Sequence, residues 1–71
     1  MSDIIIEITA NGKSYTLAER TSLTQFLEGV NLPLKSVVVE RNQQALAPSE
    51  AASVVLKDGD RLEIVRLAAG G

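Results

Sequence analysis

One amphipathic stretch, set between segments that alternate like β-strands, constrains the fold most. Residues 21–33 have the sequence TSLTQFLEGVNLP. Ser22 and Gln25 have the spacing of a capping box, with Thr21 as an alternative cap, so a helix is predicted to begin here. Gly29 and Pro33 predict its end. Four apolar residues recur at helical spacing and form one stripe: Leu23, Phe26, Leu27 and Val30.

Strands are predicted on the N-terminal side of this helix. Residues 4–9, IIIEIT, alternate with a period of two, which puts Ile4, Ile6 and Ile8 on one face. The pair Asn11-Gly12 is a strong signal for a two-residue hairpin turn. The returning strand is then SYTL, residues 14–17, with both of its large side chains on one face.

The second half of the chain predicts a third strand at residues 36–40, SVVVE, followed by a polar turn at 41–44. A short returning strand is expected at 45–47, and then one helical turn and an irregular loop over 48–60. Asp58-Gly59 marks a tight turn. The last strand is RLEIVRL, with Leu62 and Ile64 on one face and Val65 and Leu67 on the other.

This order of elements predicts an α+β fold of the β-grasp type, in which a mixed sheet of four to five strands packs on one helix. Neither the helix nor the sheet can bury its apolar side alone, so the helix must cover one face of the sheet. We expect one β-grasp domain over residues 1–66 and a flexible C-terminal tail over residues 67–71.

Composition excludes several classes of function. The 71 residues include no Cys and no His, which removes disulfides, thiolate metal sites and the commonest catalytic base. A net charge of −2 and two aromatic residues argue against a nucleic-acid binder. No apolar run is long enough to span a membrane, and the N-terminus is too acidic for a signal peptide. A cytoplasmic protein without a membrane partner is expected.

Asp58 and Asp60 flank a glycine and could suggest a metal or acid–base pair. A cation site needs several more oxygen ligands, so we interpret both as solvated carboxylates of a turn and expect no metal. Lys13 and Lys57 also lie beside turn glycines. No phosphate-loop pattern surrounds them, which favours ordinary surface lysines.

The outward face of the sheet is a candidate partner surface. Val65 and Leu67 have the parity that points away from the helix, as do Ile5 and Val38 on their own strands. Four apolar residues on an uncovered face predict a patch for a partner, although single exposed apolar residues are common.

The chain closes with Ala68, Ala69, Gly70 and Gly71. Such an end is often only a flexible tail. Two glycines can also thread a slot too narrow for any side chain, and the terminal carboxylate is ionised at neutral pH. A carboxylate is a poor electrophile, so a partner would have to activate it.

These features resemble the ThiS family, the sulfur carrier proteins of thiamine biosynthesis, which have a ubiquitin-like β-grasp fold. The resemblance is carried by the Asn11-Gly12 hairpin, the helix at 21–33, the VVVERN and LKDGDRLEIV segments and the closing Gly-Gly. Gln43 stands where many relatives have Gly, so we expect a different turn there. Ala68 and Ala69 stand where relatives often have a bulkier residue or another Gly, and Ala69 adds a Cβ near the slot that the two glycines would enter.

The resemblance implies that the carboxylate of Gly71 is the reactive group. An E1-like adenylyltransferase of the ThiF type would adenylate it with ATP and magnesium, and a cysteine desulfurase or sulfurtransferase would supply sulfur to form a thiocarboxylate. Thiazole synthase, of the ThiG type, would consume that sulfur. The carrier would hold no cofactor and catalyse nothing, while Gly70, Ala69, Ala68, Leu67, Val65, Val38 and Ile5 would contact partners.

Three alternatives remain open from the sequence. The first is a carrier of the same type that serves molybdopterin synthesis or tRNA thiolation. The second is a ubiquitin-like modifier that ends in an isopeptide bond. The third is a non-covalent interaction module with an inert tail.

Overall fold

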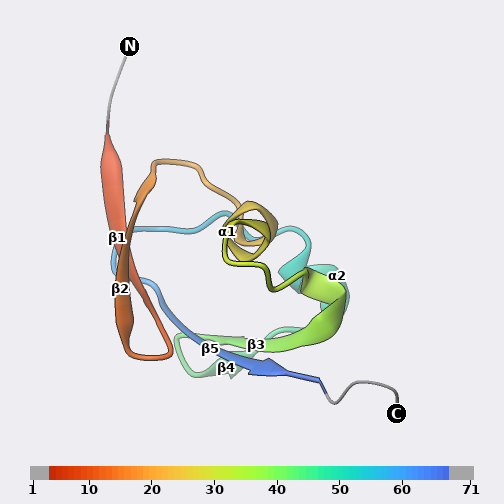
Figure 1. Cartoon of the computed structure of the whole chain (residues 1–71). Coiled ribbons are helices and arrows are strands. Elements are labelled where there is room, and N and C mark those ends of the chain that lie inside the picture. Colours follow the sequence, from red (N-terminus) through yellow and green to blue (C-terminus); the bar gives the residue numbers. More distant parts are fainter. Residues whose placement is uncertain (1–3, 68–71) are drawn as a thin grey trace.

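The computed structural model describes residues 4–67, and within them strands and helices alternate in the predicted order (Figure 1). The elements are β1 (Ile5–Ala10), β2 (Lys13–Ala18), α1 (Leu23–Gly29), η1 (Leu34–Ser36), β3 (Val37–Arg41), β4 (Gln44–Ala45), α2 (Pro48–Ala51) and β5 (Arg61–Arg66).

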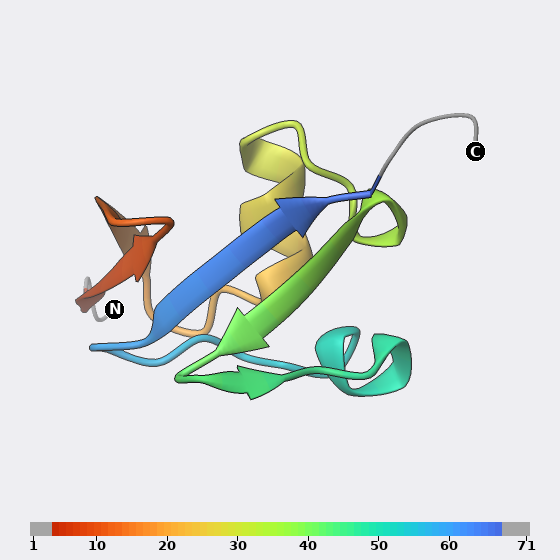
Figure 2. The ribbon, with the colours of Figure 1, turned by 90° about the horizontal axis from the view of Figure 1, so that it is seen from below.

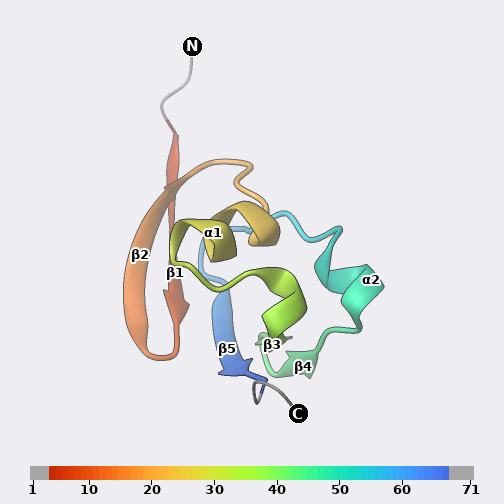
Figure 3. The same ribbon diagram turned by 45° about the vertical axis from the view of Figure 1, so that its right-hand side comes forward.

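The five strands form one mixed sheet in the order β2-β1-β5-β3-β4. The outer pairs are antiparallel hairpins, whereas the central β1 and β5 run parallel. The chain can return from β2 to the other side of the sheet only through a crossover, and α1 lies on that path. The sheet curves around α1 and leaves its opposite face uncovered by any described element (Figures 1 and 3). The predicted β-grasp arrangement is confirmed.

Helix α1 begins at the predicted capping box. The Ser22 hydroxyl accepts from the Gln25 amide at 3.0 Å, and the Gln25 side chain accepts from the Ser22 amide at 2.9 Å. Two of the amides at the helix start are therefore satisfied by side chains. The apolar stripe faces the sheet, where Leu23 and Leu27 are fully buried and Phe26 meets Tyr15 of β2 edge to face at 5.0 Å.

The core joins this stripe to the inward residues of the three central strands and to one residue each of α2 and of the loop before β5. Its members are Ile6, Ile8, Ala10, Leu23, Phe26, Leu27, Val37, Val39, Ala51, Leu56, Leu62 and Ile64. The predicted parity of the last strand is confirmed, because Leu62 and Ile64 are buried while Val65 is exposed. Ile4 was expected to share the buried face of Ile6 and Ile8. It is 51% exposed, because it precedes β1 and lies beyond the edge of the core.

Both hairpin turns use residues with positive φ. Asn11 and Gly12 have φ values of 51° and 81°, as expected for the predicted Asn-Gly turn. Asn42 and Gln43 have φ values of 52° and 71°, so Gln43 adopts the left-handed conformation that Gly would take. The expectation that this turn differs from that of relatives with Gly at this position stays a prediction.

The short return strand is also displaced from its predicted place. Strand β4 covers Gln44–Ala45 rather than residues 45–47. A two-residue turn at Asn42 and Gln43 pairs Arg41 directly with Gln44, which starts the strand one residue earlier. The turn η1, Leu34–Ser36, was not predicted.

Asp60 is not a solvated turn carboxylate, because it is only 6% exposed. It forms an ion pair with Arg41 at 2.9 Å and also accepts hydrogen bonds from the Asn42 side chain and the Lys57 amide. Asp58 is exposed, as predicted, and its carboxylate accepts from the Glu7 amide at 2.8 Å. Both carboxylates hold the loop before β5 against the sheet.

Candidate functional site

The open face of the sheet carries three exposed apolar side chains at the end of β5. Figure 2 shows this face, with β5 and β3 in front and α1 behind them. Val38 of β3 lies directly opposite Val65 of β5, and Leu67 follows two residues later with the same parity. Their exposed fractions are 45%, 63% and 49%. We call Val38, Val65 and Leu67 the apolar triplet.

The structure does not bring Ile5 to the apolar triplet. Ile5 is exposed on the same face, but β1 and β5 are parallel with Thr9 opposite Arg61. Ile5 lies four residues before Thr9 and Val65 four residues after Arg61, so roughly 26 Å of strand separates them. The predicted surface of four residues is therefore a triplet, with Ile5 at the far end of the sheet.

Hydrogen bonds hold the end of β5 that carries the apolar triplet. The Leu67 amide donates to the Ser36 carbonyl at 2.8 Å, so Leu67 is still tied to the chain before β3. On the other side, the Asn11 side chain donates to the Ile64 carbonyl at 3.0 Å and accepts from the Ile64 amide at 2.7 Å. The side-chain amide of Asn11 thus extends the hydrogen bonding between β1 and β5 beyond their last paired residues, Ala10 and Leu62.

Two carboxylates border the apolar triplet. Glu40 and Glu63 occupy the next outward positions on β3 and β5, lie directly opposite each other and are both exposed. Like charges placed opposite each other destabilise a sheet slightly. A protein surface that covered the apolar triplet would gain by placing a basic side chain over this pair.

The start of β5 is held by the Asp60 cluster. Burial by itself raises the pKa of the Asp60 carboxyl, but the hydrogen bonds from the Lys57 amide, Arg41 and Asn42 outweigh it, and the pKa lies below the ordinary value of 3.8. Asp60 is therefore ionised at neutral pH. The Asn42 side chain also accepts from the Arg61 amide at 2.9 Å, which fixes the first residue of the strand.

The described residues form neither a metal-ligand cluster nor a membrane-spanning helix. No three His, Cys, Asp or Glu side chains within residues 4–67 converge in a way that could hold a metal ion. Lys13 lies over the Tyr15 ring at 5.7 Å, a surface contact that forms no anion site. No helix of residues 4–67 is long and apolar enough to cross a membrane.

The remaining predicted site residues, Ala68, Ala69, Gly70 and Gly71, lie outside the described part of the chain. The sequence did not predict the side-chain hydrogen bonds of Asn11 and Asn42 to the backbone of β5. Each Asn opens a two-residue turn at positive φ, and that signal could have pointed to them.

This chain resembles proteins of known structure, among them a thiamine biosynthesis protein and a designed protein. A crystal structure of the thiamine biosynthesis protein ThiS from Geobacter metallireducens matches with a TM-score of 0.75 and 30% identity, covering 93% of this chain and 100% of that one. An NMR structure of a designed protein based on human erythrocytic ubiquitin matches with a TM-score of 0.53 at 19% identity, over 94% of this chain and 95% of that one, and this likeness concerns the fold alone.

Among curated proteins, a thiazole synthase of Paramagnetospirillum magneticum is 30% identical over 66 residues. The match covers 93% of this chain but only 20% of that protein, so the chain spans about a fifth of this relative's length. The model of the ThiS family matches residues 4–71, nearly the whole sequence, and the chain therefore belongs to the ThiS family.

Proposed function

We propose that this protein is a sulfur carrier for thiazole formation in thiamine biosynthesis, with the carboxylate of Gly71 as the group that is loaded. The family match carries the proposal, because it runs to residue 71 and includes the closing Gly-Gly.

The proposed reaction begins when an activating enzyme transfers AMP from ATP to the Gly71 carboxylate and releases pyrophosphate. The acyl-adenylate is a good electrophile, and a persulfide displaces AMP from it to give an acyl disulfide. A second thiol then attacks the persulfide-derived disulfide bond. This step releases the thiocarboxylate and leaves the two thiols joined as a disulfide. Sulfur is thus carried on the main chain, and no side chain of the carrier is consumed.

The apolar triplet is the proposed docking surface for the activating enzyme and for the sulfur acceptor. It lies where β5 ends, directly before the segment that must enter a partner's active site. Docking would bury Val65 and Leu67, both about half exposed or more. Removing such side chains from water supplies roughly 25 cal/mol per Å² of apolar surface. Ile5 is left out of this surface because of its distance from the triplet.

Thiazole synthase is the proposed acceptor of the sulfur. The relative from Paramagnetospirillum magneticum bears that name, and only a fifth of its length matches this chain. A segment similar to this chain therefore forms part of a protein named thiazole synthase. That arrangement supports a functional link between the two and favours thiazole formation over the molybdopterin and tRNA alternatives.

The test is the intact mass of the protein before and after incubation with ATP, the activating enzyme, a persulfide donor and a thiol. We expect a gain equal to the replacement of one oxygen by one sulfur, mapped to the C-terminal peptide. Removal of Gly71 should abolish the gain while the fold stays intact. Adducts on lysines of other proteins would instead favour a modifier, and a Gly71 that no activating enzyme adenylates would refute the proposal.

A matched pair of variants tests the docking surface. Val65→Asp and Ile5→Asp each place a carboxylate at an exposed apolar position on the same face, with exposed fractions of 63% and 67% in the native chain. Val65→Asp should raise the KM for the carrier in the adenylation assay at least about tenfold, whereas Ile5→Asp should leave it nearly unchanged. Equal effects of the two variants would contradict docking on the apolar triplet.

A further inference from the structure

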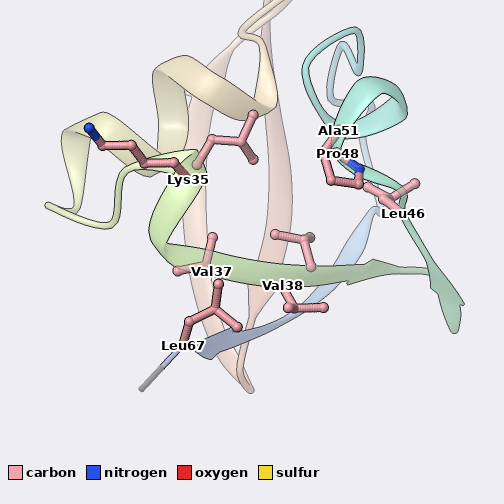
Figure 4. A pocket seen from close by; sticks show the side chains of 9 residues that line it. Lys35, Val37, Val38, Leu46, Pro48, Ala51 and Leu67 are labelled. Carbon is pink, nitrogen blue, oxygen red and sulfur yellow. The ribbon is translucent and has the colours of Figure 1, made fainter. Parts of the chain in front are cut away.

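An apolar groove runs along the free edge of β3 and adjoins the open sheet face, because Val38 and Leu67 of the apolar triplet also line it. It has a volume of about 510 Å³ and lies between η1 on one side and α2 on the other (Figure 4). Its walls include Leu34, Val38, Leu46, Pro48, Ala51 and Leu67. Volumes of this size are typical of sites that bind a ligand rather than of packing defects.

The groove exists because β4 is short. Strand β4 pairs only with Glu40 and Arg41, so the first three residues of β3 have no strand beside them on that side within residues 4–67. The Ser36 carbonyl accepts from the Leu67 amide, and this bond shows which residues of β3 direct their backbone N–H and C=O groups toward β5. Residues 36, 38 and 40 turn their backbone groups toward β5, and residues 37, 39 and 41 turn theirs away from it.

Two backbone groups at this edge have no hydrogen-bond partner among the described residues. The Val37 amide donates to the Leu34 carbonyl, and the Val39 carbonyl accepts from the Leu46 amide at 3.0 Å. The Val37 carbonyl and the Val39 amide remain, and both residues line the groove. These two groups lie on either side of Val38. In a parallel pair of strands, a carbonyl and an amide placed in this way bond to the amide and the carbonyl of one residue of the neighbouring strand.

The charged residues at the groove indicate which kind of segment it fits. The one charged residue lining it is Lys35, and an adjoining hollow of about 420 Å³ shares Lys35 and Leu67 and adds Arg66. Within residues 4–67 the single ion pair is that of Arg41 with Asp60, so neither Lys35 nor Arg66 is neutralised there. An occupant with a carboxylate at this end would gain from both cations.

We propose that this groove binds an extended segment of a partner protein, apolar in its centre and acidic at one end, which adds a short parallel strand to β3. One residue of the segment would donate its amide to the Val37 carbonyl and accept from the Val39 amide. Its neighbours would place apolar side chains in the groove, and the acidic end would lie near Lys35 and Arg66. In strand addition of this kind, main-chain hydrogen bonds provide affinity and pockets for alternate side chains provide specificity. The groove shares Val38 and Leu67 with the apolar triplet, but the proposal goes beyond sulfur carriage because it uses the backbone groups of Val37 and Val39 at the edge of the sheet.

The test uses the full chain labelled with ¹⁵N and the synthetic peptide acetyl-Glu-Val-Ile-Val-Ile-Glu-Glu-amide. Amide shifts should move for Val37, Val39, Leu46 and Lys35, with an affinity tighter than about 1 mM. Ile5 at the far end of the open face serves as the internal control and should not shift. No shift at these amides, or shifts centred on Val65, would overturn the proposal.

A set of N-methylated peptides tests the strand geometry itself. Successive amides of a strand point to opposite sides, so methylation of alternate residues should weaken binding by about tenfold and methylation of the residues between them should not. Uniform sensitivity, or none, would show a simple apolar pocket and overturn strand addition. Spectra of the protein alone that change with its concentration at Val37 and Val39 would also overturn it, in favour of a second copy of this chain.

Lys35→Glu tests the charge argument without disturbing the core, because Lys35 is exposed. The variant should bind the acidic peptide about threefold to tenfold more weakly than the native chain does. It should bind more tightly the same peptide with Lys in place of its terminal Glu residues. The adenylation assay should be unchanged in this variant, so failure of the groove proposal and failure of the carrier proposal are distinguishable. Equal affinity of Lys35→Glu for both peptides would refute an acidic occupant.

Discussion

Asp60→Asn is the substitution that tests most directly how the loop before β5 is held. Oδ2 of Asp60 accepts from Arg41 Nε at 3.0 Å and from the Lys57 amide at 2.8 Å, and Oδ1 accepts from the Asn42 side chain at 3.1 Å. Asparagine has the same shape but only one oxygen that can accept. Its NH₂ group would therefore face either the Asn42 side chain or the donors Arg41 and Lys57. The ion pair with Arg41 is lost as well.

The expected loss of unfolding free energy is about 2–3 kcal/mol. Breaking a fully buried ion pair costs about 3–5 kcal/mol, and a hydrogen bond to a charged group contributes about 1.5–3 kcal/mol. The expected loss lies at the lower end of these ranges, because the Arg41 side chain keeps 24% of its surface exposed and can turn to water. In a domain of this size, 1 kcal/mol shifts Tm by about 4–8 °C, so Tm should fall by roughly 8–24 °C.

Urea denaturation followed by circular dichroism measures this loss, and Asp58→Asn is the matched control. Asp58 lies in the same turn but is exposed, and its Oδ1 acceptor for the Glu7 amide survives as an amide oxygen. The control should stay within about 0.5 kcal/mol of the native chain. An Asp60→Asn variant as stable as Asp58→Asn at neutral pH would refute a structural role for the buried carboxylate.

The pH dependence provides a second check on Asp60. Its pKa in the folded chain lies below the ordinary value of 3.8, at which the unfolded carboxyl titrates. The stabilisation by the ionised form is therefore complete above that value and is lost as the pH falls through the folded pKa. The difference between the native chain and Asp60→Asn should be constant near neutral pH and shrink below about pH 4. A difference that persists unchanged into acid would refute the assignment to the ionised carboxyl.

Three further substitutions test other parts of the fold. Leu27→Ala should cost about 2–5 kcal/mol of unfolding free energy, because Leu27 is fully buried, and an unchanged urea midpoint would show that the helix stripe is misassigned. Asn11→Gly keeps the positive φ of the turn but removes both side-chain bonds to Ile64, so stability should fall by about 1–3 kcal/mol and the Ile64 amide should exchange faster. Gln43→Gly should stabilise the chain by about 1 kcal/mol in thermal unfolding, because Gln43 holds φ at 71°, and a lower Tm would contradict strain at this turn.

The elements that the sequence predicts well are those determined locally. The capping box at Ser22 and Gln25, the Asn11-Gly12 turn and the alternation along β5 each depend on residues a few positions apart. Local rules of this kind fix which face a side chain occupies. They therefore gave the correct exposure of Val65 and Val38 and the correct burial of Leu62.

The features that the sequence does not predict depend on register and on distant partners. Parity places Ile5 on the open face, but only the pairing of Thr9 with Arg61 shows that it lies far from Val65. Asp60 is buried because Arg41 and Asn42, nearly twenty residues earlier, converge on it. The groove along β3 arises from where β4 stops, and a two-residue strand leaves almost no pattern to recognise.

The side-chain bonds that cross between elements far apart in sequence converge on β5 and the loop before it. Asn42 fixes Arg61 at its start, Asp60 anchors the preceding loop and Asn11 clamps Ile64 near its end. This strand is therefore held at both ends, while its outward residues stay exposed. A partner that grips Val65 and Leu67 meets a surface that is already ordered, so little conformational entropy is lost in docking. The segment that follows residue 67 then starts from a fixed point, which would favour the proposed delivery of the Gly71 carboxylate into a partner's active site.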